Sequence, residues 1–292
     1  MPDFNLSEHL KEKRSTLSAS SIKTYTSILS SLYGKVFGNS DDIDPKKFED
    51  TEKILGHLHG LPPNKRKTIL SALVCVTEDK KYRELMLEDI QSYNKDLSKQ
   101  EKTPEQEESW ISQGDVKTVF DKLQTNANLL YKKKEPTPKD LQQIQDYIIM
   151  SVLSGVFIAP RRSLDNVSFK IKNINDKEDN FLSKNQFVFN KYKTAKYYNE
   201  QRVDVPIQLK NIIVKWIKIN PTDFLLFDSN QNALTSVKLN QRLVRILGHK
   251  TSVNILRHSY LTSKFGDQID KNKEMEDVSS EMGKNLKEYD FK

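Results

Sequence analysis

The chain has 292 residues, which is enough for two domains of ordinary size, each with its own core. Hydrophobic residues make up 36% and charged residues 30%, and no apolar run approaches the length of a membrane span, so we expect no membrane contact. The formal net charge of +7 suits a polyanionic partner such as nucleic acid, although many basic proteins bind none. The single cysteine excludes an internal disulfide and fits a reducing, intracellular setting.

The first hundred residues show helical spacing of apolar side chains and almost no strand signal. Helix starts are indicated at Ser18 or Ser20, at Asp44-Pro45 and at Pro62-Pro63. The expected helices cover about 16–37, a stretch from 44, a stretch from 62 and about 79–98. The sequence therefore predicts an all-helical domain over residues 1–98.

Polar and charged residues dominate the next segment, where Leu97 is the one apolar side chain between residues 96 and 108. This composition is typical of a solvated linker, which we place at residues 99–109. A second domain is then expected over residues 110–292.

The second domain has mixed periodicity. Helices are expected from Asp115 to Leu130, from Asp140 to Ile158, and at about 207–218, 236–247 and 253–265. Strand-like runs at 187–189 and 202–205 flank the polar segment 190–201, which predicts a hairpin with a basic tip. The fold class is therefore α+β, mainly helical, with a small antiparallel sheet near residues 165–206.

Four short patterns in the second domain carry candidate chemistry, and each alone is common on protein surfaces. In chain order they are Ser154-Gly155-Val156-Phe157-Ile158-Ala159-Pro160-Arg161-Arg162-Ser163-Leu164-Asp165, Asn190-Lys191-Tyr192-Lys193-Thr194-Ala195-Lys196, Asn254-Ile255-Leu256-Arg257-His258-Ser259-Tyr260, and Met282-Gly283-Lys284 followed by Tyr289. Their order and separations, behind a helical domain, are more informative than any one of them.

Together these patterns resemble the conserved boxes of tyrosine recombinases, the phage-integrase type of DNA breaking-rejoining enzyme. The first resembles the Arg-x-x-Glu box, with Asp165 in the acidic place. The second lies where that family keeps a lysine on a hairpin. The third resembles the His-x-Leu-Arg-His box, and the fourth resembles the Leu-Gly-His…Tyr terminus. The resemblance covers about residue 110 to the end, and the first domain looks like the family's core-binding domain. The Pro-Arg-Arg-x-x-Asp form is similar to integrases of large DNA viruses, virophages and related mobile elements.

The resemblance implies cleavage and rejoining of DNA without a metal or other cofactor. Tyr289 would attack a phosphodiester and form a 3′-phosphotyrosyl bond, which stores the energy for rejoining. Arg162 and Arg257 would clamp the phosphoryl oxygens, and Lys193 would protonate the leaving 5′ oxygen. Accessory roles fall to Asn254, His258, Lys284 and Asp165, and DNA contacts fall to Lys191, Lys196 and Arg161.

Three departures from the family pattern leave alternatives open. Asn254 stands where most relatives have histidine, Lys284 stands where histidine or tryptophan is usual, and the interval from Lys284 to Tyr289 is short. An amide can donate a hydrogen bond but cannot shuttle a proton. One alternative is a DNA-binding protein of recombinase ancestry that no longer cuts, and another is a type IB topoisomerase-like enzyme.

The expected partners follow from the same resemblance. We expect double-stranded DNA held in a clamp by the two domains, with several protomers, as in a tetramer, on paired sites. The expected location is wherever the target DNA lies, which is the host nucleus or cytoplasm for a viral chain.

Overall fold

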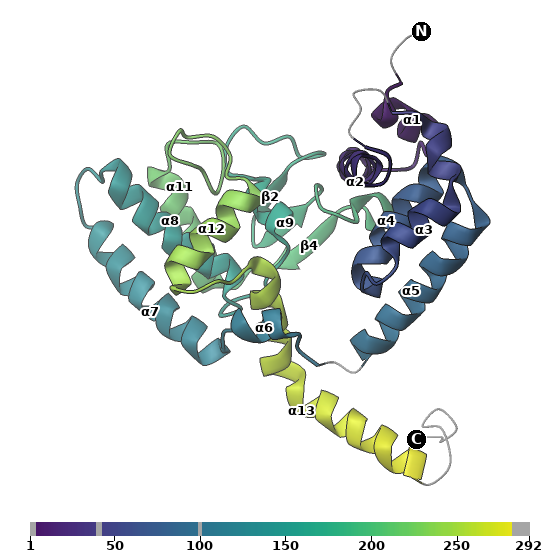
Figure 1. The fold of residues 1–292 in the computed structure, drawn as a ribbon. Coiled ribbons are helices and arrows are strands. Elements are labelled where there is room, and N and C mark those ends of the chain that lie inside the picture. Colours follow the sequence, from purple (N-terminus) through teal and green to yellow (C-terminus); the bar gives the residue numbers. More distant parts are fainter. Residues whose placement is uncertain (1–3, 39–42, 99–100, 282–292) are drawn as a thin grey trace. The chain divides into compact units, whose positions relative to one another are not determined.

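The structure is a computed structural model that describes residues 4–38, 43–98 and 101–281. The chain divides into two compact units, Met1–Glu101 and Lys102–Lys292. Figure 1 labels helices and strands of both units.

The described residues of unit 1 form helices and connecting turns, with no strand. Its elements are α1 (Leu6–Lys13), α2 (Ala19–Phe37), the 3-10 helix η1 (Pro45–Glu49), α3 (Thr51–Leu58), α4 (Pro63–Thr77) and α5 (Lys80–Ser98). Ser18 caps α2 by accepting a hydrogen bond from the Ser21 amide. The stretch predicted from Asp44 is two elements, because Asp44 and Asp50 each cap a separate turn. Helix α1 was not predicted.

Unit 1 is held by a core that draws on all of its helices. Tyr82 is fully buried, and its hydroxyl donates to the Phe48 carbonyl at 2.9 Å, which joins α5 to η1. A bidentate ion pair between Arg66 and the buried Asp89 joins α4 to α5, with nitrogen–oxygen distances of 2.9 and 2.6 Å.

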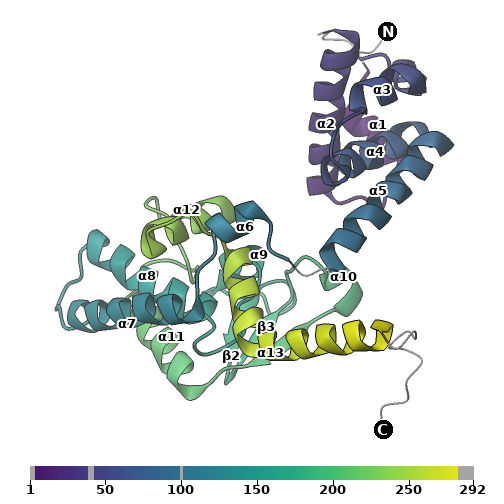
Figure 2. The same ribbon diagram turned by 60° about the horizontal axis from the view of Figure 1, so that its bottom comes forward.

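Unit 2 is a mainly helical α+β unit with a small sheet (Figures 1 and 2). Its helices are α6 (Pro104–Glu108), α7 (Gln113–Leu130), α8 (Pro138–Leu153), α9 (Ser163–Val167), α10 (Ala195–Tyr198), α11 (Ile207–Ile219), α12 (Ser236–Leu247) and α13 (Val253–Glu281). Its strands are β1 (Phe169–Lys170), β2 (Asn180–Ser183), β3 (Gln186–Phe189) and β4 (Gln201–Asp204). Helix α6 lies within the segment predicted as a linker, where Thr103 and Gln106 form a capping box.

The sheet has four strands in the order β1-β2-β3-β4. Strands β3 and β4 pair antiparallel, with Phe187 opposite Val203, so the predicted hairpin is present. Strands β1 and β2 pair parallel, so the expectation of a purely antiparallel sheet was wrong. The polar segment 171–179 between them lets the chain cross over and run in the same direction again.

Helix α8 runs through the core of unit 2 and buries every residue from Tyr147 to Leu153. It ends at Leu153 rather than at the predicted Ile158, because Gly155 adopts a positive φ of 84° and turns the chain. Helix α13 continues to Glu281, well past the predicted end, and its second half extends beyond the rest of the unit (Figures 1 and 2). Among the described helices, none is both long and apolar enough to cross a membrane.

Candidate active site

The segment after α8 carries Arg162 and packs against the start of α13, which carries Arg257. Gly155 lies under the ring of Tyr260, and a Cβ at this glycine would come within 2.5 Å of Tyr260 Cδ2. Gln113 of α7 adds a hydrogen bond of 3.1 Å from its amide to the buried hydroxyl of Ser259. These contacts fix the two arginine-bearing segments beside each other, although 95 residues separate the arginines in the chain.

The guanidiniums of Arg162 and Arg257 lie close enough to influence each other. Burial lowers the pKa of Arg257, and the positive charge of Arg162 lowers it further. Arg162 is exposed, and its side chain makes no ion pair or hydrogen bond with another described residue. Arg257 is half-buried, and its one side-chain partner among the described residues is the neutral Asn254, at 3.4 Å. Two neighbouring cations without a direct counter-ion form a site for an anion.

Arg161 and Arg162 play different parts in the structure, although they are adjacent in the sequence. The Arg161 side chain donates to the Asp165 carboxylate at 2.9 Å and to the Gln201 amide oxygen at 3.1 Å. Its guanidinium also lies 4.0 Å from the centre of the Phe189 ring. Arg161 therefore joins α9 to strands β3 and β4, while Arg162 remains free. The predicted DNA contact of Arg161 stays a prediction.

Asp165 lies beneath the arginines. Its side chain is almost fully buried, and burial raises its pKa, while Arg161, Arg162 and Arg257 act to lower it. One carboxylate oxygen accepts from Arg161, and the other, Oδ1, is buried without a hydrogen-bond partner among the described residues. One carboxylate among three guanidiniums leaves the cluster positive, which suits a phosphate.

The side chain of Asn180 connects the arginine segment to the lysine-bearing loop. It is fully buried at the start of β2, and its amide nitrogen donates to the carbonyls of Asp165 at 3.0 Å and Lys191 at 2.8 Å. Its oxygen accepts from the backbone amides of Asn190 at 2.9 Å and Lys191 at 2.7 Å. One amide thus fixes both the end of α9 and the beginning of the loop.

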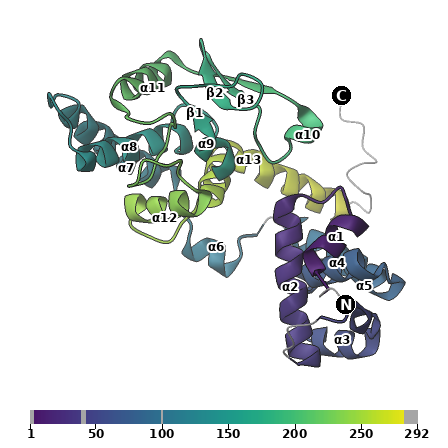
Figure 3. The ribbon, with the colours of Figure 1, turned by 90° about the horizontal axis from the view of Figure 1, so that it is seen from above.

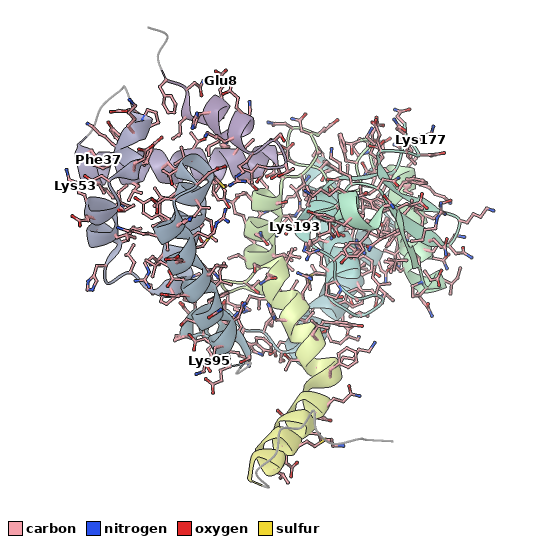
Figure 4. The ribbon with its side chains drawn as sticks, turned by 90° about the vertical axis from the view of Figure 1, so that its right-hand side faces the viewer. Glu8, Phe37, Lys53, Lys95, Lys177 and Lys193 are labelled. Carbon is pink, nitrogen blue, oxygen red and sulfur yellow. The ribbon has the colours of Figure 1, made fainter. Side chains whose placement is uncertain are left out.

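Lys193 lies on that loop, between β3 and β4, and its side chain is exposed (Figure 4). The loop is closed by a hydrogen bond of 2.7 Å from the buried Tyr192 hydroxyl to the Asn199 carbonyl. No hydrogen bond or ion pair of the Lys193 side chain is present among the described residues. Lys191 and Lys196 are also exposed on this loop. The structure therefore fixes the base of the loop next to α9 and leaves the three lysines open to solvent.

The remaining predicted residues divide into two groups. Asn254 and His258 flank Arg257 on α13, and both are exposed. Lys284 and Tyr289 lie outside the described residues. Within the described part of the chain, no group of three or more His, Cys, Asp or Glu side chains is placed to hold a metal ion.

Sequence reasoning missed the residues that connect these patterns. Asn180 and Gln201 lie in none of the four patterns, and Gly155 lies in the first pattern without an assigned role; the roles of all three depend on pairings between distant segments. A weak signal for Gly155 was present, since a glycine shortly after a strong helix is typical of a helix end. Asn180 gives no such signal, because the sequence does not reveal that its amide is buried.

The chain is similar to known proteins in structure, but it matches none of those searched by sequence. A scan against protein-family models finds no match, and a search of curated proteins finds none either. Among solved structures, the chain is similar to XerA recombinase, with 13% identity and a TM-score of 0.37, over 88% of this chain and 83% of that one. It is also similar to a lambda integrase (75–356) dimer bound to a COC′ core site, with 10% identity and a TM-score of 0.44, over 90% of this chain and 89% of that one. A lambda integrase tetramer bound to a Holliday junction gives 10% identity and a TM-score of 0.41, over 91% of this chain and 71% of that one.

Proposed function

We propose that this chain is a tyrosine recombinase that cleaves and rejoins DNA strands through a 3′-phosphotyrosyl intermediate. The observation that carries the proposal is the pair of neighbouring arginines, Arg162 and Arg257, which have no direct counter-ion among the described residues. A single buried carboxylate, Asp165, lies among these two guanidiniums and that of Arg161, so the cluster keeps a net positive charge that favours an anionic ligand at that place.

The proposed chemistry assigns one role to each residue. The Tyr289 oxygen forms a bond to phosphorus, and the bond from phosphorus to the 5′ oxygen breaks. Arg162 and Arg257 stabilise the extra negative charge on the non-bridging oxygens, and both stay protonated at any working pH. Lys193 gives a proton to the leaving 5′ oxygen. Asn254 donates an amide hydrogen to a phosphoryl oxygen, and His258 and Lys284 act as accessory groups.

The proposed substrate is double-stranded DNA, which both units would contact. Lys191 and Lys196 would contact the backbone, so affinity would fall steeply as salt rises. Recombination requires four strand cuts, so we propose that several protomers assemble on paired sites. A role in integration by a viral or other mobile element, within the compartment that holds the target DNA, belongs to the same proposal.

The test is covalent trapping on nicked duplexes of randomised sequence, in which the freed fragment diffuses away and rejoining fails. The wild type should form an adduct that survives denaturation, and Arg162→Ala and Arg257→Ala should not. Arg202→Ala is the matched control, because it removes an exposed arginine that pairs with Glu200 outside the cluster. DNA binding without an adduct in the wild type would favour the non-cutting alternative. Relaxation of supercoiled plasmid at limiting protein would favour the topoisomerase-like one.

A further inference from the structure

Two adjacent tyrosines on α10 are held out into solvent. Tyr197 and Tyr198 are 69% and 66% exposed, and the one other exposed Phe, Tyr or Trp among the described residues, Phe265, reaches 39%. Figures 2 and 3 show α10 projecting from the sheet on the side of unit 2 away from α7 and α11. Aromatic rings contribute most when they are buried, so such a pair at a projecting tip indicates a surface that contacts a partner.

Hydrogen bonds hold the loop that carries the two rings in a defined conformation. Its first residues are fixed by Asn180, and the Tyr192 hydroxyl closes it at Asn199. Asn199 has a φ of 54° and a ψ of −152°, an unfavourable backbone conformation that the surrounding contacts maintain. A preorganised loop loses little conformational entropy when a partner binds.

The surroundings of the rings identify the chemistry of the partner. Three exposed lysines, Lys191, Lys193 and Lys196, lie on the same loop, and Lys196 Nζ is 4.8 Å from the centre of the Tyr197 ring. The nearest acidic residue in sequence, Glu200, is paired with Arg202. Exposed cationic side chains next to exposed flat aromatic rings match a nucleic acid strand, which presents both phosphates and bases.

We propose that Tyr197 and Tyr198 form a stacking platform for unpaired DNA bases beside the phosphate that Lys193 serves. The inference rests on the proposed function, because strand exchange requires the freed 5′ end to leave its duplex. The bases next to the break then lose their stacking partners, and an aromatic ring replaces them without regard to sequence. The platform therefore holds the displaced end close to the lysine until the strands are rejoined.

The experiment measures noncovalent binding of the full chain, in an Arg257→Ala background, to a duplex with a short gap. The first unpaired base of the gap is 2-aminopurine, whose fluorescence falls when it stacks. We expect quenching on binding with both tyrosines present. Replacing both by alanine should remove the quenching and weaken binding to the gapped duplex by between about fivefold and 150-fold. Binding to intact duplex should change by less than about threefold, because phosphate contacts dominate it.

Two controls keep the outcomes separate. Tyr197→Phe with Tyr198→Phe should retain quenching and affinity, and Val237→Ala removes an apolar side chain of the same 66% exposure from α12 and should have no effect. Retained quenching and affinity in the alanine variant, or equal loss in the phenylalanine variant, would overturn the platform. Quenching and affinity are measured without any covalent step, so they test the platform alone. Formation of the covalent adduct is the separate test of the proposed function.

Discussion

Asn180→Ala removes the buried amide that fixes both α9 and the beginning of the lysine loop. The substitution removes four hydrogen bonds between the Asn180 side chain and the backbone. The carbonyls of Asp165 and Lys191 lose a donor, and the amides of Asn190 and Lys191 lose an acceptor. A buried polar group left without a partner costs about 1–3 kcal/mol, and water entering the space offsets part of this cost where the group is only partly buried. We expect a loss of about 2–4 kcal/mol in the free energy of unfolding of unit 2. The corresponding fall in its transition temperature is roughly 5–15 °C.

The assay is thermal unfolding of the full chain, followed by the rate of adduct formation on nicked duplex. A displaced loop should slow cleavage by roughly ten- to hundredfold, because Lys193 would no longer be held near the phosphate. Noncovalent DNA affinity should change little, since many phosphate contacts share it. The matched control is Asn185→Ala, which removes an exposed asparagine whose side chain accepts only from Lys210 among the described residues. It should cost less than about 0.5 kcal/mol.

A second variant separates hydrogen bonding from packing. Asn180→Asp keeps the shape of the side chain but presents carboxylate oxygens to the two carbonyls that now accept from the amide nitrogen. We expect it to be at least as destabilising as Asn180→Ala at neutral pH. The reasoning is refuted if Asn180→Asp unfolds at the wild-type temperature, or if Asn180→Ala resembles Asn185→Ala in both stability and cleavage.

Three further predictions concern other parts of the chain. Arg257→Ala should abolish the covalent adduct while changing DNA affinity by less than about threefold, and a binding curve that is flat between low and physiological salt would exclude the basic surface as a DNA site. Gly155→Ala should cost about 1–3 kcal/mol in thermal unfolding, because its Cβ meets the Tyr260 ring and its φ is positive; wild-type stability would contradict the packing described. Asp140 has a pKa of about 2, chiefly through its hydrogen bond from Lys133, against an ordinary value of 3.8. Because the pKa of this carboxyl is lower in the folded state, its ionised form stabilises the fold above pH 3.8, and this stabilisation is lost as the pH falls to about 2. The free energy of unfolding of Asp140→Asn should therefore depend less on pH over that window than that of the wild type.

Much of the fold could be predicted because it depends on local patterns. Helices α2 and α4 follow from apolar spacing and from a capping serine or an initial proline, and the β3–β4 hairpin follows from two apolar runs around a polar segment. The parallel pairing of β1 with β2 could not be predicted, because β1 has only two residues and its partner is chosen by tertiary packing. The full length of α13 was missed because its second half has no continuous apolar face.

The candidate site could likewise be predicted only in part. The arginines and lysines were identified from their types and order, but their arrangement depends on contacts between distant segments. Arg161 and Arg162 illustrate this, since their neighbouring positions in the sequence do not reveal that Arg161 pairs with Asp165 while the Arg162 side chain is exposed. Asn180 and Gly155 position the site without entering the chemistry, and the four patterns assigned neither of them a role.

The most direct test of the central claim is to identify the amino acid that becomes attached to DNA. Wild-type protein trapped on nicked duplex would be digested, and the peptide that carries the nucleotide mapped by mass spectrometry. The account predicts attachment at Tyr289 and loss of the adduct in Tyr289→Phe, with DNA binding and thermal stability unchanged, because the substitution removes only a hydroxyl. Attachment at Tyr260 or Tyr192, or an undiminished adduct in Tyr289→Phe, would show that the nucleophile is a different residue and would contradict the assignment.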